Sequence, residues 1–273
     1  MSQREQWHFD ENPDEVYERY LVPAKFGPWA ADLVELGAPQ SGERVLDVAC
    51  GTGVVTRLMV PRVGATGKVV GLDLNGGRLA VARSVPSDSG ISIEWREGDV
   101  SALPFLDGSF DLITCQQGVQ FFPDRLAAMG EMFRVLVPGG RLVFNIWRSI
   151  EHQPGALAMA IALERHVSAE AAALRRTPFA LGDREAIEAP LKEAGFLDIA
   201  IHSRVKAVRF PSAEAFTMRY LSGSAAPLVR MVSEADDSAR AALVEDVNVA
   251  LQPYMGADGL ACPTASHLVT AHT

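Results

Sequence analysis

Short apolar runs alternate with amphipathic segments along the middle of the chain. The apolar runs have the length and composition of strands that are buried on both faces. They predict strands at 44–50, 68–74, 91–97, 110–116 and 141–147, with helices near 52–61, 76–85 and 124–136. Repeated strand–helix–strand order of this kind is typical of a parallel, doubly wound α/β sheet.

The segment before the first strand has a helical pattern from residue 14 to residue 37. Pro23 and Pro28 interrupt it, so we expect two short amphipathic helices. Because the segment is rich in aromatic residues and precedes the sheet, we expect residues 1–40 to form a lid over a ligand pocket.

Beyond residue 150 the chain becomes rich in alanine and predicts mainly helices. A strand at 199–210 shows approximate period-two alternation, which suits an edge strand with one wet face. Its predicted apolar face comprises Ile199, Ile201, Val205 and Ala207. A helical stretch at about 212–252 separates it from a last strand at 266–272.

The chain shows no Gly/Ser linker, internal repeat or low-complexity tract. We therefore expect a single domain over residues 1–273. It would consist of the lid, a cofactor-binding core at 41–150, and a region at 151–273 with helical insertions and the last two strands.

Composition and charge exclude several classes of function. The net charge is −9 and no basic cluster occurs, which argues against a nucleic-acid-binding protein. The polar first residues and the lack of a long apolar run predict a cytoplasmic protein without a membrane span. Cys50, Cys115 and Cys262 are too far apart to suggest a zinc site, so we expect no metal.

Candidate chemistry lies where the first two strands end. The first strand leads through Asp47 into a turn with Gly51 and Gly53, and a helix follows. Doubly wound folds place their ligand at this position, and glycines let it approach the backbone. The second strand ends 20 residues after Gly53 at Asp73, whose carboxylate is placed to accept from both hydroxyls of an adenosine ribose. Asp99 follows the third strand and can accept from the amine of adenine.

An NAD-dependent oxidoreductase would share much of this geometry. Its glycine motif requires a third small residue, and that position is Thr56 here. A pyrophosphate also requires donors, whereas a cationic sulfonium with an ammonium group favours carboxylates. Asp47, Asp73 and Asp99 therefore fit such a cation better than a dinucleotide.

Five segments in order, VLDVACGTG, GLDLN, GDVSALPF, FDLITCQQGVQFFPD and LVPGGRLVFNIW, resemble the successive motifs of class I S-adenosylmethionine-dependent methyltransferases. The chain is similar to the ubiquinone and menaquinone C-methyltransferase group of small-molecule enzymes over roughly residues 40–150. The resemblance implies a Rossmann-like sheet of seven strands whose last is antiparallel. It also implies methyl transfer from S-adenosyl-L-methionine to a small-molecule O, N or C nucleophile, with S-adenosyl-L-homocysteine as the product.

The resemblance assigns parts of the cofactor to particular residues. Ala49 and Gly51 would contact the methionine end through their backbone, and Asp73 would bind the ribose. Gln116 would lie beside the transferred methyl group. The adenine contacts would come from Leu74, Asp99 and Val100.

The methyl acceptor cannot be identified from the sequence. Its pocket is expected to use side chains of the N-terminal helices and of the segments after the fourth and fifth strands. The candidates are Tyr17, Tyr20, Gln117, Phe121, Trp147 and Arg148, with His152 and His8 as possible general bases. A protein that binds S-adenosylmethionine without transferring its methyl group is the alternative, and it would yield no S-adenosylhomocysteine.

Overall fold

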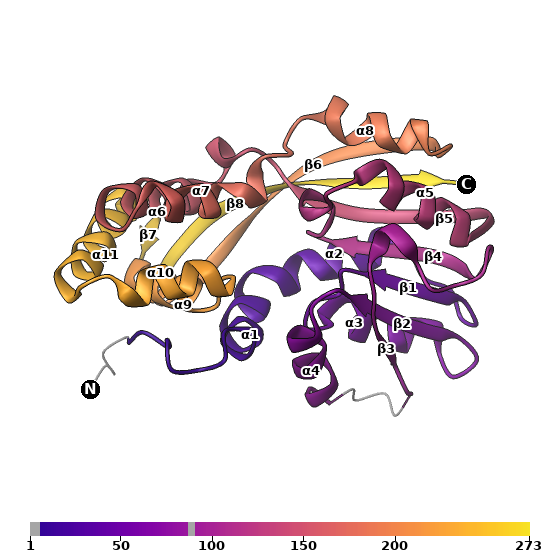
Figure 1. The fold of residues 1–273 in the computed structure, drawn as a ribbon, viewed down its shortest axis with the longest axis horizontal. Helices are drawn as coiled ribbons and strands as arrows, with labels where there is room; N and C mark the ends of the chain where they lie inside the picture. Colours follow the sequence, from indigo (N-terminus) through magenta and orange to yellow (C-terminus); the bar gives the residue numbers. More distant parts are fainter. Residues whose placement is uncertain (1–5, 87–90) are drawn as a thin grey trace. The chain divides into compact units, whose positions relative to one another are not determined.

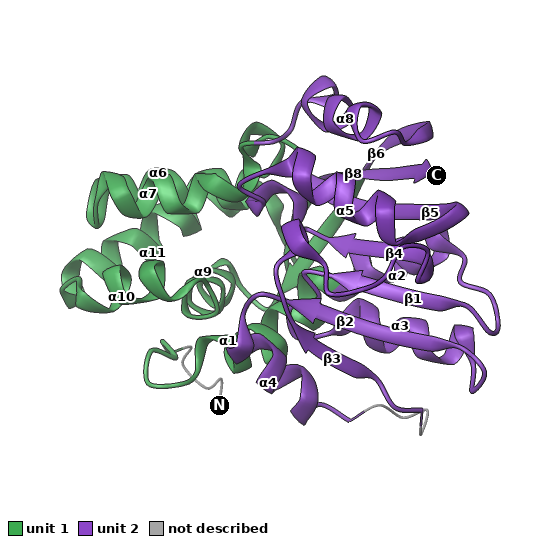
Figure 2. Cartoon of the chain, turned by 45° about the vertical axis from the view of Figure 1, so that its right-hand side comes forward, with its two compact units in different colours: residues 1–26, 148–180, 205–265 green, residues 27–147, 181–204, 266–273 purple. Residues whose placement is uncertain are grey.

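The computed structural model describes residues 6–86 and 91–273, and their contacts divide the chain into two compact units. The sheet unit comprises residues 27–147, 181–204 and 266–273, and the helical unit comprises 6–26, 148–180 and 205–265 (Figure 2). The first five residues of the expected lid lie outside the described part of the chain. That the chain acts as a single domain with a lid stays a prediction.

The described strands form one eight-stranded mixed sheet (Figure 1). Seven strands follow the order β3-β2-β1-β4-β5-β8-β6, and the short β7 pairs only with β8. Neighbours from β3 to β5 are parallel, whereas β8 runs antiparallel to β5. The strands are β1 (Arg44–Val48), β2 (Lys68–Asp73), β3 (Glu94–Glu97), β4 (Phe110–Gln116), β5 (Leu136–Trp147), β6 (Leu197–Phe210), β7 (Met255–Gly256) and β8 (Gly259–His272). This arrangement confirms the predicted doubly wound fold with an antiparallel last strand.

Helices of the sheet unit cover the sheet and contribute to its apolar core. The core includes Leu46, Phe144 and Met129, all fully buried. The central strands β1, β2 and β4 are largely buried on both faces, which explains their nearly continuous apolar sequences. The edge strand β3 is only partly buried, so the expectation that it is covered on both faces is wrong. The helices are α2 (Gly27–Gly37), α3 (Val54–Val63), α4 (Gly76–Ser84), α5 (Arg125–Val135) and α8 (Arg184–Glu193), with 3₁₀ turns at Val100–Ala102 and Val119–Phe121.

The helical unit has its own apolar core, to which Leu163, Leu221 and Leu243 contribute fully buried side chains. Its π-helix and α-helices are α1 (Pro13–Val16), the π-helix η1 (Tyr17–Phe26), α6 (Pro154–His166), α7 (Ala169–Arg176), α9 (Ala213–Ser222), α10 (Ala226–Glu234) and α11 (Asp237–Leu251). Its 3₁₀ turns are Ile150–His152, Thr177–Phe179 and Gln252–Tyr254.

The N-terminal segment differs from the two short helices expected. Pro23 does not end a helix but lies inside the π-helix η1, which continues directly into α2. A wider π-turn accommodates a residue without an N–H more readily than a regular α-helix does. Within the sheet unit, α2 packs against β4 and β5, and Trp29 and Leu33 are buried.

The edge strand β6 is where expected, but its apolar face is not continuous. Ile201 is buried, whereas Val205 is 63% exposed, so the expected face including Val205 and Ala207 is wrong. Val208 and Phe210 are buried instead. The strand passes from the sheet unit into the helical unit between residues 204 and 205, so a different core selects which side chains are covered.

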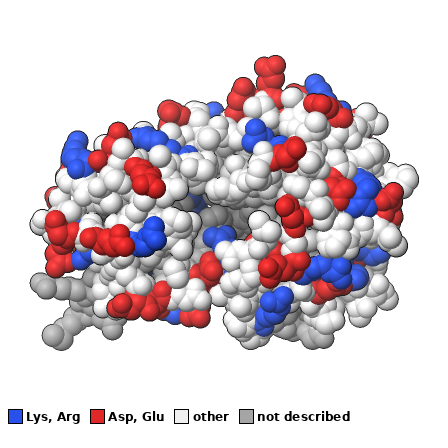
Figure 3. Space-filling view, in the orientation of Figure 1, with Lys and Arg blue, Asp and Glu red and all other residues white. Residues whose placement is uncertain are grey.

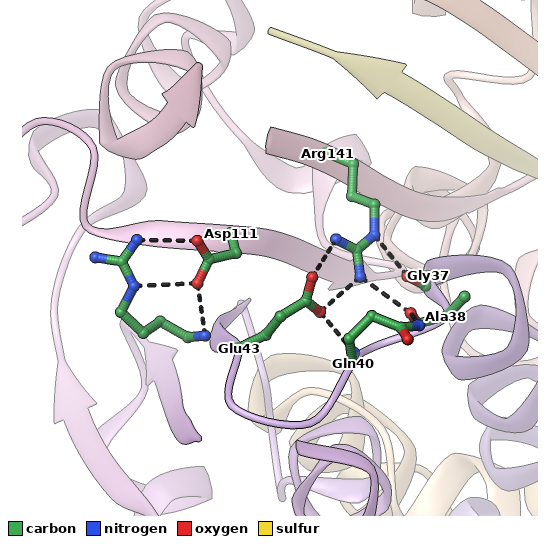
Figure 4. A network of polar contacts seen from close by, with 7 residues as sticks. Gly37, Ala38, Gln40, Glu43, Asp111 and Arg141 are labelled. Atoms are coloured by element: carbon green, nitrogen blue, oxygen red, sulfur yellow. Dashed lines mark hydrogen bonds and ion pairs between the residues drawn. The ribbon is translucent and has the colours of Figure 1, made fainter. Parts of the chain in front are cut away.

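Arg141 on β5 holds the polypeptide that leads into β1 (Figure 4). Its guanidinium donates to both carboxylate oxygens of Glu43, at 2.8 and 2.7 Å, and to the carbonyls of Gly37 and Ala38. Burial acts to raise the pKa of Glu43. The hydrogen bonds from Arg141 and from the backbone N–H of Gln40, together with the charge of Arg141, outweigh it, so the pKa lies below its usual value. The network fixes the end of α2 and the start of β1 against the sheet.

Acidic and basic side chains are interspersed over the face drawn in Figure 3. Among the helices of the described residues, none combines the length and the apolar character needed to cross a membrane.

Candidate functional site

The loop after β1 has a backbone conformation that favours glycine. Ala49, Gly51 and Gly53 have φ values of 52°, 57° and 86°. Gly53 is also the N-cap of α3. Glycine adopts positive φ without the steric cost that a side chain brings. The loop therefore presents its backbone at the carboxyl ends of β1 and β2, where doubly wound folds bind their ligands.

Asp73 at the end of β2 contacts this loop directly. Its carboxylate accepts hydrogen bonds from the backbone N–H of Gly51 at 2.7 Å and of Asn75 at 2.8 Å. The residue is only 8% exposed, so its carboxylate is largely covered by the protein. Two carboxylate oxygens provide about four lone-pair sites, so acceptor capacity remains for hydroxyl groups.

Asp47 lies fully buried within β1, below the loop. Its two carboxylate oxygens accept from the hydroxyls of Thr56 at 2.6 Å and Thr114 at 2.9 Å. Thr114 is its register partner on β4, which explains why the two side chains meet. Burial raises the pKa of Asp47 to about 7, against the opposing effect of the two hydroxyls. A direct contact between Asp47 and a cofactor stays a prediction.

Trp95 on β3 was not predicted as part of the site, but two glycines accommodate it. A Cβ at Gly71 would lie 2.5 Å from Cζ3 of the indole, and a Cβ at Gly53 would also overlap the ring. Beside Gly53, the Thr52 hydroxyl is buried without a hydrogen-bond partner. The requirement for glycine at position 71 is visible only when β2 and β3 are seen side by side.

The candidates for adenine binding follow β2 and β3, which are parallel neighbours. Leu74 is 70% exposed, which is unusual for a large apolar side chain and leaves it accessible to a ligand. Asp99 caps the next 3₁₀ turn by accepting from the N–H of Ser101 at 2.8 Å. Val100 is buried, with 7% exposed. Their roles in adenine binding stay predictions.

A buried polar cluster follows β4, beyond Gln116. Gln117 has a positive φ of 55°, and its backbone N–H donates to the carbonyl of Asn145 at 3.0 Å. Its side-chain amide donates to Ser266 at 3.1 Å and accepts from Gln120 at 3.4 Å. Nδ2 of Asn145 and Oε1 of Gln120 are buried without hydrogen-bond partners. These two unpaired groups mark a place for a polar ligand. Asn145 and Gln120 were not predicted as part of the site, whereas Gln117 was.

The other acceptor candidates are divided between the two units. Trp147 is buried in the sheet unit with its ring 5.9 Å from that of Trp29, and Phe121 is 54% exposed. In the helical unit, the Tyr17 ring lies 4.8 Å from that of Phe26. There the ring of Tyr20 lies 5.0 Å from that of His8.

The two proposed bases have partners in the helical unit. Nε2 of His152 lies 2.7 Å from a guanidinium nitrogen of Arg148. Nδ1 of His8 lies 2.6 Å from the carboxylate of Glu11. Neither arrangement tests a catalytic role, so both assignments stay predictions.

All three cysteines are buried free thiols. Burial raises the pKa of Cys50 and Cys115 and brings that of Cys262 to about 11, which makes them poor nucleophiles. Within residues 6–86 and 91–273, no group of three or more His, Cys, Asp or Glu side chains is arranged to hold a metal ion.

Two named proteins are similar in sequence to this chain over somewhat less than half of its length. A 2-phytyl-1,4-naphtoquinone methyltransferase of Thermosynechococcus vestitus is 49% identical over 132 residues, which cover 46% of this chain and 57% of that protein. A demethylmenaquinone methyltransferase of Thermus thermophilus is 41% identical over 135 residues, 47% of this chain and 61% of that protein. The chain thus matches little more than half the length of these relatives.

A solved structure supports the fold over a longer span. Phosphoethanolamine N-methyltransferase 2 of Haemonchus contortus, in complex with S-adenosyl-L-methionine, has a TM-score of 0.55 at 19% identity, covering 90% of this chain and 52% of that chain. The model of the ubiE/COQ5 methyltransferase family matches residues 24–160, which is half of the chain. This chain therefore belongs to the ubiE/COQ5 methyltransferase family.

Proposed function

We propose that this protein transfers the methyl group of S-adenosyl-L-methionine to a small molecule. The observation that carries the proposal is the pairing of Asp73 with the loop of positive φ at Ala49, Gly51 and Gly53. Membership of a methyltransferase family and the motifs around these residues support it.

The residues present fit the proposed cofactor. Asp73 retains acceptor sites for the two ribose hydroxyls, and Leu74 offers an exposed apolar surface for adenine. The loop after β1 can bring its backbone close to the methionine end, where Thr52 has an unused buried hydroxyl. S-adenosylmethionine, when bound, supplies a methyl group that its sulfonium already activates.

The protein's own task is then mainly to position the acceptor. Methyl transfer is an in-line displacement, so the nucleophile must lie on the extension of the sulfur–methyl bond. The buried amides of Gln117 and Gln120, with Asn145, provide donors and acceptors that can orient an oxygen or nitrogen of the acceptor. A proton released from the acceptor would pass to a base, for which His152 and His8 remain the candidates.

The acceptor itself is proposed only as a class, a small organic molecule. Relatives named for 2-phytyl-1,4-naphtoquinone and demethylmenaquinone make a naphthoquinone derivative one compound to test. However, the family match ends at residue 160, and most of the helical unit lies beyond it. Of the acceptor candidates, Tyr17 and Tyr20 lie outside the family match, whereas Gln117, Phe121, Trp147 and Arg148 lie within it.

Incubation of the protein with S-adenosylmethionine and a panel of phenols, amines and reduced naphthoquinones tests the proposal. We expect S-adenosylhomocysteine to accumulate with at least one acceptor. Binding of S-adenosylmethionine without product over the whole panel would instead favour the alternative of a binding protein. Tight binding of NAD would contradict the cofactor assignment.

A further inference from the structure

A small cavity lies inside the helical unit. It is partly open to solvent, and its enclosed part has room for about one water molecule. Side chains from η1, α7 and α9 line it together with residues of β6 and β8. The lining includes Lys25, Arg175, Tyr220, Gln153, Phe216 and Val208.

Two basic side chains are buried around one phenol in this cavity. Lys25 is 3% exposed and Arg175 is 4% exposed. Nζ of Lys25 donates to the Tyr220 hydroxyl at 2.6 Å. Cζ of Arg175 lies 4.4 Å from the centre of the Tyr220 ring, and Nζ of Lys25 lies 4.7 Å from it. Both cations therefore act on the same side chain.

The two basic side chains of the cavity have no acidic side chain in the lining to compensate them. Nε of Arg175 is buried without a hydrogen-bond partner, and the lining contains no Asp or Glu. A buried charge is costly unless an opposite charge or hydrogen bonds compensate it. An anionic group entering the cavity would supply both.

The pKa of the Tyr220 phenol reflects the two neighbouring positive charges. Burial alone acts to raise the pKa of Tyr220, but the charges of Arg175 and Lys25 outweigh it and lower the pKa to about 8. Burial also lowers the pKa of Lys25. The position of Lys25 depends on η1, a ten-residue π-helix, and π-helical turns are frequent at functional sites.

The rest of the lining is mainly apolar or aromatic, with Phe216, Val208 and Ala156 facing the cavity. We propose that this cavity is a binding site for a small organic acid, whose carboxylate or phenolate oxygen accepts hydrogen bonds from Arg175 and Lys25. The guanidinium binds such oxygens well because its planar, rigid fork can direct two parallel N–H groups at one carboxylate. The small enclosed space favours a short carboxylate, such as formate or acetate, over a larger acid.

The test uses the full chain without S-adenosylmethionine, so its failure is distinct from a failure of methyl transfer. Formate, acetate and benzoate are titrated calorimetrically, each beside its uncharged amide. We expect at least one carboxylate to bind and its amide to bind about ten- to a hundredfold more weakly, as expected for loss of a charge-assisted hydrogen bond. Equal binding of acids and amides, or no binding of any acid, would overturn the proposal.

Two variants locate the site. Arg175→Met should weaken carboxylate binding by about tenfold or more. Arg176→Met is the matched control, because Arg176 is the next residue of α7, pairs with Glu164 and does not line the cavity. Equal losses in both variants would show a general effect of charge and contradict the site.

If Arg175→Met does not fold, the site can still be tested on the wild-type protein by a pH titration. The phenolate absorbance of Tyr220 is followed against pH with and without saturating acid, and Tyr220→Phe identifies its contribution. A bound anion should raise the pKa of this phenol, because it offsets the neighbouring charges. An unchanged titration with acid bound would place the acid elsewhere. Product formation with S-adenosylmethionine then separates an acid that is a methyl acceptor from one that only binds.

Discussion

The backbone N–H of Gly51 donates a 2.7 Å hydrogen bond to the carboxylate of Asp73, which links the loop after β1 to the end of β2. The residue expected to bind the ribose thus also fixes the loop expected to bind the methionine end. Changes at Asp73 will therefore affect the protein in two separable ways, through cofactor affinity and through folding.

Replacement of Asp73 by alanine should weaken binding of S-adenosylmethionine by roughly thirty- to a thousandfold. The estimate assumes a net loss of about 2 to 4 kcal/mol from charge-assisted hydrogen bonds to the ribose. The free energy of unfolding should also fall, by about 1 to 3 kcal/mol, because Gly51 and Asn75 lose their acceptor. Calorimetric titration and urea unfolding measure the two effects.

Asp73→Asn should lose less than Asp73→Ala, because the amide keeps one oxygen acceptor. Glu35→Ala removes an exposed carboxylate on α2 and serves as the matched control. Unaltered affinity in Asp73→Ala would overturn the ribose assignment. Unaltered stability would contradict the structural role.

Replacement of Asp47 by asparagine should flatten the pH dependence of stability. The pKa of Asp47 is raised from 3.8 to about 7, so the folded protein holds this proton more tightly than the unfolded chain does. The stabilisation is fully present below about pH 4 and is lost as the pH rises towards 7, and it amounts to at most about 4 kcal/mol. Urea unfolding at several pH values across this range, in both proteins, measures the difference.

Thr114→Val provides the companion to that experiment. Removal of the Thr114 hydroxyl takes away a hydrogen bond that favours the ionised carboxylate, so the pKa of Asp47 should rise further. The pH range over which stability is lost should then extend upward. A wild-type protein that becomes more stable than Asp47→Asn as the pH rises would refute the assignment.

Substitution of Gly71 by alanine should destabilise the sheet unit by about 1 to 3 kcal/mol, the usual cost of overpacking a core. The new methyl group would lie 2.5 Å from the Trp95 ring and 3.1 Å from Sγ of Cys50. Gly130→Ala is the control, since nothing lies within 4 Å of its Cβ position on α5 and alanine favours helices. Thermal unfolding should show opposite shifts for the two variants. If the Trp95 ring is the cause, Trp95→Ala should relieve the loss in the double variant.

Removal of the Arg141 guanidinium, as Arg141→Met, should cost about 2 kcal/mol of unfolding free energy. Glu43 is left with an unpaired and largely covered carboxylate, and the carbonyls of Gly37 and Ala38 lose a donor. Because the folded pKa of Glu43 is lowered, the wild-type stabilisation should be lost as the pH falls through that pKa. A double variant with Glu43→Met should be less destabilised than the sum of the two single changes.

Local patterns sufficed to predict the sheet. The apolar run at 110–116 coincides with β4, and the family inferred from the loop motifs is confirmed by the family match. The period-two pattern did not predict which side chains of β6 are buried, because the two ends of this strand contribute to two different cores. Strand ends were also missed, since β8 begins at Gly259 and not at residue 266.

Only those residues of the candidate site that stand in a recognisable sequence motif could be predicted. Gly51 and Asp73 stand in such motifs, and the structure brings them together. Lys25 and Arg175 have no motif, and 150 residues separate them in the chain. Only the tertiary packing of η1, α7 and α9 places both beside Tyr220. The burial of Asp73 and its hydrogen bond from Gly51 likewise depend on the packing of β1 beside β2.

The position of β8 between β5 and β6 affects how the chain is made. During synthesis β6 leaves the ribosome about 50 residues before the strand that joins it to the sheet. At a few to some twenty residues per second, β6 waits for several seconds with unpaired backbone groups, and such strands readily pair with other chains. The exposed side chains of Arg204 and Arg209 place positive charge along the unpaired edge of β6. This charge discourages pairing with other chains until β8 has been synthesised.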